Sequence, residues 1–154
     1  MVDGLEVLLD SAEQHIRRVL LEQKEDELVP LFVMAKPDEM ILCPTPWRDD
    51  FEKALMVDMV RQEMRKEGVK AYVFMSEAWS AKQPAGWKPG DPEGPAPSDR
   101  PDRQEIVFAL ACDKERALER VWRIVRGEAG TIVKLEREEK TTTGLVGRMA
   151  GLLR

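Results

Sequence analysis

The stretch from Thr45 to Ser76 constrains the fold most, because it reads as a helix that leads directly into a strand. No helix-breaking residue occurs between Asp49 and Glu67, and Gly68 then follows a charged final turn, as expected at a helix C-terminus. Residues 69–75 form an almost continuous run of apolar and strand-forming residues, which is typical of an interior strand. This helix and strand form the centre of the predicted domain.

Two residues are candidates for the N-cap of the central helix. Thr45 precedes Pro46, which suits the first helical position, whereas Asp49 has Glu52 three residues later as a capping-box partner. Apolar side chains cover a wide arc of this helix, which predicts a largely buried helix with contacts on two sides. Its three methionines favour core packing over an adaptable binding face. The arc contains Leu55, Met56, Val57, Met59, Val60 and Met64.

The N-terminal third of the chain predicts another helix and a hairpin. Asp3 and Glu6 have the spacing of a capping box. After them, apolar residues recur with the spacing of one helical face. The runs 28–34 and 40–43 read as strands joined by a turn at 36–39. The apolar face of the helix contains Leu5, Leu8, Leu9, Ala12, Ile16, Val19 and Leu20.

Residues 113–126 support two predictions equally well. As a helix, the segment would place Leu118, Val121, Trp122 and Val125 on one face and would end at Gly127. As a strand, its β-branched residues would lead through a Gly-containing turn at 127–130 into a further strand at 131–135. The periodicity favours the helix, whereas the composition and the turn favour the strand, so both predictions stay open at this point.

Residues 77–103 form a long Pro- and Gly-rich stretch after the central strand. Such a composition excludes a helix or an interior strand. A connection of this length in a compact domain is usually either functional or disordered. Trp79 and Trp87 favour function, because large aromatic rings in a polar loop normally pack on the protein or on a partner. Since residues 104–112 read as the next strand, the stretch predicts a hairpin with a very long tip.

The composition excludes several classes of protein. A chain of 154 residues that is 43% hydrophobic and 34% charged predicts one globular domain. A net charge of −5 argues against a general nucleic-acid binder or a protein of anionic membrane surfaces. No apolar run approaches the roughly 20 residues of a membrane span. Acidic Asp3, Glu6 and Asp10 do not fit a secretory signal, so we expect a cytoplasmic protein.

The cysteines and the histidine predict no metal site and no catalytic triad. Cys43 and Cys112 lie beside strand-like runs without CxxC spacing, which favours buried thiols. His15 is the only histidine and lies at the border of the apolar face of the first helix. Because this single histidine lies in the first helix, far from both cysteines, we exclude a multi-His metal site and a His-based catalytic triad within one chain. We therefore expect no metal and no cofactor.

The predicted architecture is α+β. We expect a mostly antiparallel sheet of roughly four to six strands with two main helices packed on it and a short C-terminal helix. Residues 1–140 would form the domain, including the loop at 77–103, and residues 141–154 an amphipathic tail. The tail contains three glycines, and each costs a helix about 1 kcal/mol relative to alanine. It therefore needs a surface to dock on, either its own domain or a second copy.

These features favour a non-enzymatic protein-interaction or self-associating module. The loop at 77–103, with Trp87, and the tail at 141–154 would contact a protein partner or a second copy. The proline content of the loop stiffens it and so lowers the entropy that binding costs. Neither segment carries a recognisable catalytic motif.

Two other functions remain open from the sequence. A carboxylate-based enzyme, with or without Mg²⁺, would use Glu77, because this residue ends an apolar strand beside Trp79 and burial there would raise its pKa. Phosphate or nucleic-acid binding would use Arg116, Arg120 and Arg123, although neighbouring glutamates dilute their charge. Other loop or strand-end carboxylates considered for the enzyme are Asp49, Asp50, Asp99 and Asp102.

Overall fold

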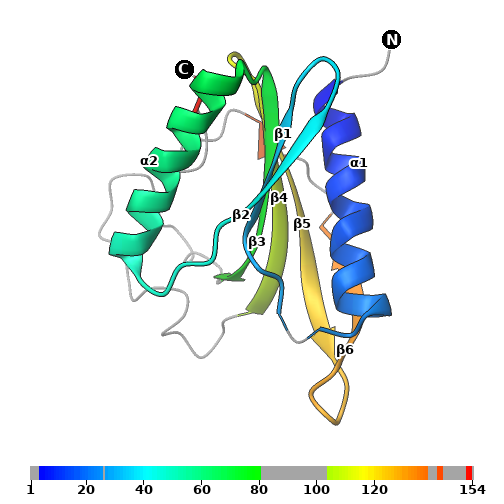
Figure 1. Ribbon diagram of the computed structural model, residues 1–154. Coiled ribbons are helices and arrows are strands. Elements are labelled where there is room, and N and C mark those ends of the chain that lie inside the picture. Colours follow the sequence, from blue (N-terminus) through cyan, green and yellow to red (C-terminus); the bar gives the residue numbers. More distant parts are fainter. Residues whose placement is uncertain (1–3, 26, 81–103, 139–141, 144–151, 154) are drawn as a thin grey trace, which may run out of the picture.

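The computed structural model describes residues 4–25, 27–80, 104–138, 142–143 and 152–153. It confirms an α+β fold built on an antiparallel sheet with two main helices (Figure 1). The helical segments are α1 (Gly4–Arg17), the π-helical turn η1 (Arg18–Glu22) and α2 (Asp50–Glu67). The strands are β1 (Leu31–Ala35), β2 (Met40–Pro44), β3 (Ala71–Ser80), β4 (Gln104–Cys112), β5 (Ala117–Arg126), β6 (Ile132–Arg137) and the two-residue β7 (Thr142–Thr143).

The strands follow the order β2-β1-β3-β4-β5-β6, and β7 pairs with β5. Every pair of neighbours is antiparallel. The hairpin predicted from the first two strand-like runs is confirmed as β1–β2. The prediction that the Pro-rich stretch joins neighbouring strands is also confirmed, because β3 pairs with β4 along its length and the ladder ends at Ser80 and Gln104.

Helix α1 covers one face of the sheet, which we call the α1 face. The helix packs on β3, β4 and β5, and its apolar stripe is buried there as the periodicity predicts. The stripe extends into η1, where Leu20 is fully buried. On the sheet side the same core contains Leu31, Val73, Met75, Val107, Ala109, Ala111, Leu118, Trp122 and Ile124.

Helix α2 lies on the opposite side of the sheet, on what we call the α2 face (Figure 1). Asp49 is its N-cap and accepts a 2.8 Å hydrogen bond from the Glu52 N–H, while Gly68 ends the helix with a φ of 66°. Thr45 does not cap the helix, because its N–H and hydroxyl both bond to the carbonyl of Pro30. On the sheet side the core contains Phe32, Met34, Tyr72, Phe74, Leu110 and Cys112.

The prediction that α2 is largely buried is wrong. Only Val57, Val60 and Met64 of this helix are buried, because the sheet covers one side of it. Of the three methionines, Met64 packs in the core, whereas Met59 is exposed. The wide apolar arc in the sequence is therefore two faces, one against the sheet and one in solvent.

The segment 113–126 is a strand and not a helix. Its side chains alternate between more and less buried positions along β5, and Asp113 accepts the Glu115 and Arg116 N–H groups in the turn before it. After β5, the Gly127 N–H bonds to the carbonyl of Thr131, and Gly130 adopts a φ of 79°, which glycine tolerates best. The turn and the β-branched residues thus outweigh the helical periodicity.

The predicted C-terminal helix lies almost entirely outside the described residues. Leu152 and Leu153 form part of a turn, and Leu152 is buried in the core of the α2 face. Its N–H donates a 3.3 Å hydrogen bond to the Tyr72 hydroxyl. The capping box predicted at Asp3 also falls outside the described part of the chain.

Candidate functional site

Four polar or aromatic residues lie close together on the α1 face, near the C-terminal end of β3. They are Glu77, Trp79, Glu105 and Arg126. Glu77 and Trp79 lie two positions apart on β3, and Trp79 is paired with Glu105 on β4. The Glu105 carboxylate accepts two hydrogen bonds from the Arg126 guanidinium, at 2.7 and 2.9 Å. This bidentate pair lowers the pKa of Glu105. Glu77 and Trp79 are recognisable in the sequence as candidate residues, whereas Glu105 is not, because its partner Arg126 lies on a different strand.

Glu77 has the electrostatic character that the enzyme hypothesis requires. Burial raises the pKa of its carboxyl group, and the nearby carboxylates of Glu105 and Glu27 add to this effect. The same carboxylate, however, accepts a 2.9 Å hydrogen bond from the backbone N–H of Leu28, which opposes the rise. The Glu77 carboxylate therefore accepts the hydrogen bond of a backbone N–H in the segment between η1 and β1, and this contact has a structural role.

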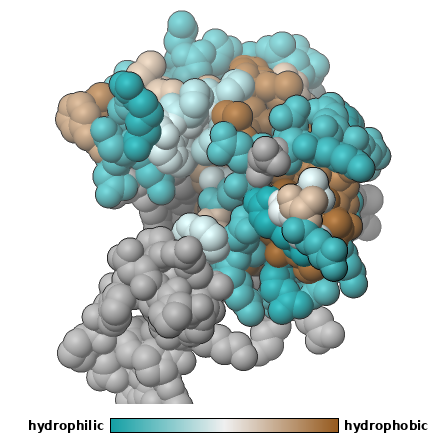
Figure 2. Space-filling view, turned by 90° about the horizontal axis from the view of Figure 1, so that it is seen from below, coloured by the Kyte–Doolittle hydropathy of each residue, from teal (hydrophilic) through white to brown (hydrophobic). Residues whose placement is uncertain are grey.

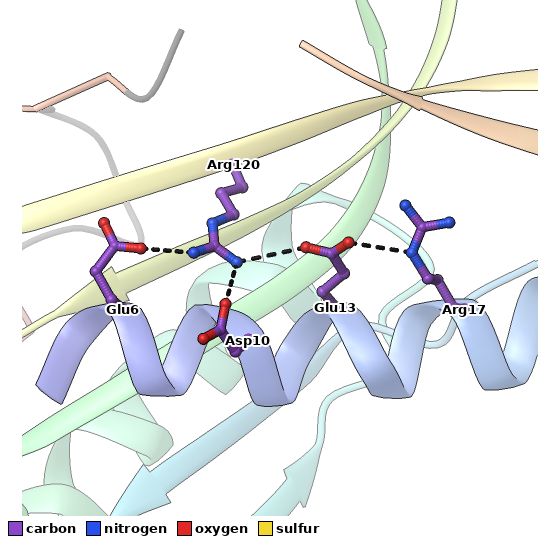
Figure 3. Close-up of polar contacts among 5 residues, drawn as sticks. All are labelled: Glu6, Asp10, Glu13, Arg17 and Arg120. Atoms are coloured by element: carbon purple, nitrogen blue, oxygen red, sulfur yellow. Dashed lines mark hydrogen bonds and ion pairs between the residues drawn. The ribbon is translucent and has the colours of Figure 1, made fainter. Parts of the chain in front are cut away.

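Arg120, on β5, forms ion pairs with carboxylates of α1 (Figure 3). Its side chain is buried and reaches the carboxylates of Glu6 at 2.5 Å, Asp10 at 2.7 Å and Glu13 at 3.4 Å. Glu13 also pairs with Arg17 at 3.1 Å. Burial, the largest single influence, lowers the pKa of Arg120, but the hydrogen bonds and charges of Asp10 and Glu6 together outweigh it, so the pKa is raised. The guanidinium thus connects β5 to three successive turns of α1.

The three arginines proposed for phosphate binding do not share a surface. On β5, Arg120 pairs with Ala109 on the α1 face, whereas Arg123 points to the α2 face and forms an ion pair with Glu136. Arg116 precedes the strand, in the turn that Asp113 stabilises. Successive side chains of a strand point to opposite faces of the sheet, so these arginines lie apart. On a helix, which the sequence also allowed, they would lie on one side.

The remaining predicted groups lie apart. Trp79 is partly exposed, and Trp87 lies outside the described residues. Cys43 and Cys112 are on the α2 face and form no disulfide, and burial raises the pKa of Cys43. Among the described residues, no three His, Cys, Asp or Glu side chains are arranged to hold a metal ion. In the same part of the chain, no helix is both long and apolar enough to cross a bilayer.

An apolar stripe lies on the outer side of α2, and we call it the α2 stripe. It consists of Phe51, Leu55 and Met59, which are 72%, 50% and 62% exposed. A spacing of four residues places them in one row along the helix. Figure 2, which shows the molecule from below, has a largely hydrophilic surface with separate hydrophobic patches. The wide apolar arc in the sequence was the signal for this stripe, but it did not show which side faces solvent.

A second apolar feature lies between α1 and the edge strand β2. Two adjoining pockets of about 410 and 280 Å³ share His15, Leu31 and Leu42 in their walls. Burial and the charge of Arg18 lower the pKa of His15, which favours its neutral form. Helix α1 packs on β3 to β5 and leaves the β1–β2 part of this face more open.

Comparisons with protein-family models, with curated proteins and with solved structures found no match to this chain.

Proposed function

We propose that this chain is a non-enzymatic protein-interaction module. The observation that carries the proposal is the α2 stripe. Rows of large apolar side chains at helical spacing are characteristic of surfaces that bind another helix. Here the row stands on a helix that is capped at both ends and packed on its other side, so the stripe is not needed to hold the helix in place.

The charges beside the α2 stripe favour a different protein over a second copy. Glu52 and Asp58, three residues before and after Leu55, border the stripe on its two sides. Pairing with a second copy would therefore bring acidic side chains together on both borders, which opposes self-pairing. The partner that fits is an apolar helix face bordered by basic side chains, which would meet Asp58 and the acidic first turn of α2.

The loop that the sequence places at 77–103, whose first residues form the end of β3 up to Ser80, and the tail at 141–154 remain part of this proposal. Trp79, at the base of the loop, is 42% exposed, and Leu152 anchors the end of the tail in the core. Both segments could therefore extend the contact surface from fixed points on the domain. The cytoplasmic location and the absence of a cofactor stay predictions from the sequence.

The test compares proteins that co-purify, from the cells that make this chain, with the wild type and two variants. Leu55→Glu places a charge in the α2 stripe, and Val133→Glu makes the same change at an exposed position of β6. We expect one protein with a basic, apolar surface to be retained in a fixed ratio by the wild type and Val133→Glu and lost from Leu55→Glu. Identical sets of proteins with all three chains would overturn the proposal.

A further inference from the structure

The outer edge of β2 carries open backbone hydrogen-bonding groups. At the two ends of the β1–β2 ladder, the Lys36 N–H bonds to the Glu39 carbonyl at 2.9 Å and the Thr45 N–H to the Pro30 carbonyl at 2.8 Å. Hydrogen-bonded pairs alternate in an antiparallel ladder, so Ile41 and Cys43 face β1. The N–H and C=O groups of Met40 and Leu42 therefore point away from β1, along an edge on which no described strand pairs.

Among the described residues, this edge has few of the features that usually prevent strand pairing. Natural edges are protected by short strands, charged side chains, prolines, bulges or covering segments. The outer strand β6 follows this rule, with Lys134, Glu136 and Arg137. Strand β2 has no charged residue, and its Leu42 side chain is 66% exposed. Within the described part of the chain, the features that limit this edge are its length of five residues and Pro44, which lacks an N–H at one end.

We propose that a second copy of this chain pairs with β2 in the antiparallel direction, with Leu42 opposite Leu42 of the other copy. In this register each Leu42 N–H donates to the other Leu42 carbonyl, and each Met40 N–H donates to the Pro44 carbonyl of the other copy. Because Pro44 has no N–H, the Met40 carbonyl at each end of the pairing receives no hydrogen bond from the other copy. All N–H groups that face the other copy still find an acceptor. The two sheets become one continuous sheet through the symmetry axis.

The residues that precede β2 favour the antiparallel direction. With Leu42 opposite Leu42, Asp38 and Glu39 lie opposite the uncharged Pro46 and Thr45 of the other copy. Parallel pairing in register would instead place Glu39 beside Glu39 of the other copy, which is unfavourable. This arrangement also covers Leu42, whose side chain lines both pockets beside α1.

The test uses the direct contact of Leu42 with its own copy. We expect the wild type to be a dimer by native mass spectrometry, and Leu42→Lys and Leu42→Glu each to be monomers, because each would place like charges opposite one another. An equimolar mixture of the two variants should form a heterodimer, since lysine then faces glutamate. Val133→Lys, which changes another exposed apolar residue, on β6, should leave the dimer intact.

A second measurement covers the case in which a Leu42 variant fails to fold. Hydrogen exchange of the wild-type Met40 and Leu42 amides should be slow at high protein concentration and fast after dilution, whereas the Ile41 amide, which faces β1, should change little. A monomeric wild type, a dimer unaffected by either charge, or variants that do not pair in the mixture would overturn the inference. The α2 stripe is a separate surface, so these results leave the proposed function untouched.

Discussion

Arg120 shows how one buried charge connects two elements that are far apart in the sequence. A buried guanidinium is tolerated only where carboxylates compensate its lost hydration. Here Glu6, Asp10 and Glu13 do so from one side of α1. These carboxylates are themselves partly exposed, so they retain hydration if the arginine is removed.

Replacing Arg120 by methionine should lower the free energy of unfolding by about 2 kcal/mol, which is a typical contribution of a hydrogen bond to a charged group. Asp10→Asn should cost less, because Glu6 and Glu13 still compensate the charge. Chemical denaturation measures both values. Arg123→Met is the matched control, and its partly exposed ion pair with Glu136 should contribute about 0–1 kcal/mol. A loss from Arg120→Met no larger than that of the control would contradict this account.

Glu77 and Glu105 should affect stability in opposite directions as pH changes. The pKa of Glu77 is raised above its ordinary 4.5, so the folded state loses stability as pH rises from there through the folded pKa. The pKa of Glu105 is lowered, so its contribution is present above 4.5 and is lost as pH falls through the folded pKa. Thermal unfolding at pH 4 and pH 7 distinguishes the two residues.

Relative to the wild type, Glu77→Gln should therefore be more stable at pH 7 than at pH 4, whereas Glu105→Gln should be less stable at pH 7 than at pH 4. Glutamine can still accept the Leu28 N–H, so the comparison isolates the charge. The same pH dependence in both variants would show that burial does not dominate at Glu77.

At the scale of elements, the N-cap of α2 is a defined contribution to stability. Asp49→Ala removes the side chain that accepts the Glu52 N–H and should destabilise the protein by about 1 kcal/mol. Asp50→Ala, one residue inside the helix, should cost less because Asp50 is not the N-cap. If urea denaturation gave equal losses of unfolding free energy for the two variants, Asp49 would not be the N-cap.

The sequence predicted the elements better than their surroundings. Alternation, turns and apolar periodicity predicted α1, the β1–β2 hairpin, and the pairing of β3 with β4, because these signals are local. Burial depends on distant partners, so the exposed side of α2 and the position of Arg120 under α1 could not be predicted. The segment 113–126 was ambiguous because Trp122 and its neighbours fit both periods.

For the candidate site, the sequence found single residues but not their relations. Glu77 and Trp79 were recognisable as unusual at the end of an apolar strand. Their association with Glu105 and Arg126 depends on the register of three strands, which no local pattern encodes. The open edge of β2 could be recognised only from the strand order, because the same five residues in an interior strand would have neighbours on both sides.

At the scale of the whole molecule, the long loop and the domain should be separable. Deleting residues 82–98 leaves residue 81 and residues 99–103 to connect β3 with β4, whose ladder is already complete at Ser80 and Gln104. Shortening a loop lowers its closure entropy only slightly, so the melting temperature should change little. Binding to the partner of the α2 stripe should weaken if the loop extends that surface; unchanged affinity would confine the interface to α2.

The most direct test of the proposed function is site-specific photo-crosslinking from position 55, in the cells that make this chain. The crosslinking side chain would replace Leu55, in the middle of the α2 stripe, and Val133 would be the control position. We expect one crosslinked product from position 55, with a mass of 17.6 kDa plus that of a different protein, and no such product from position 133. No product from position 55, or a product containing only a second copy of this chain, would overturn the proposed function.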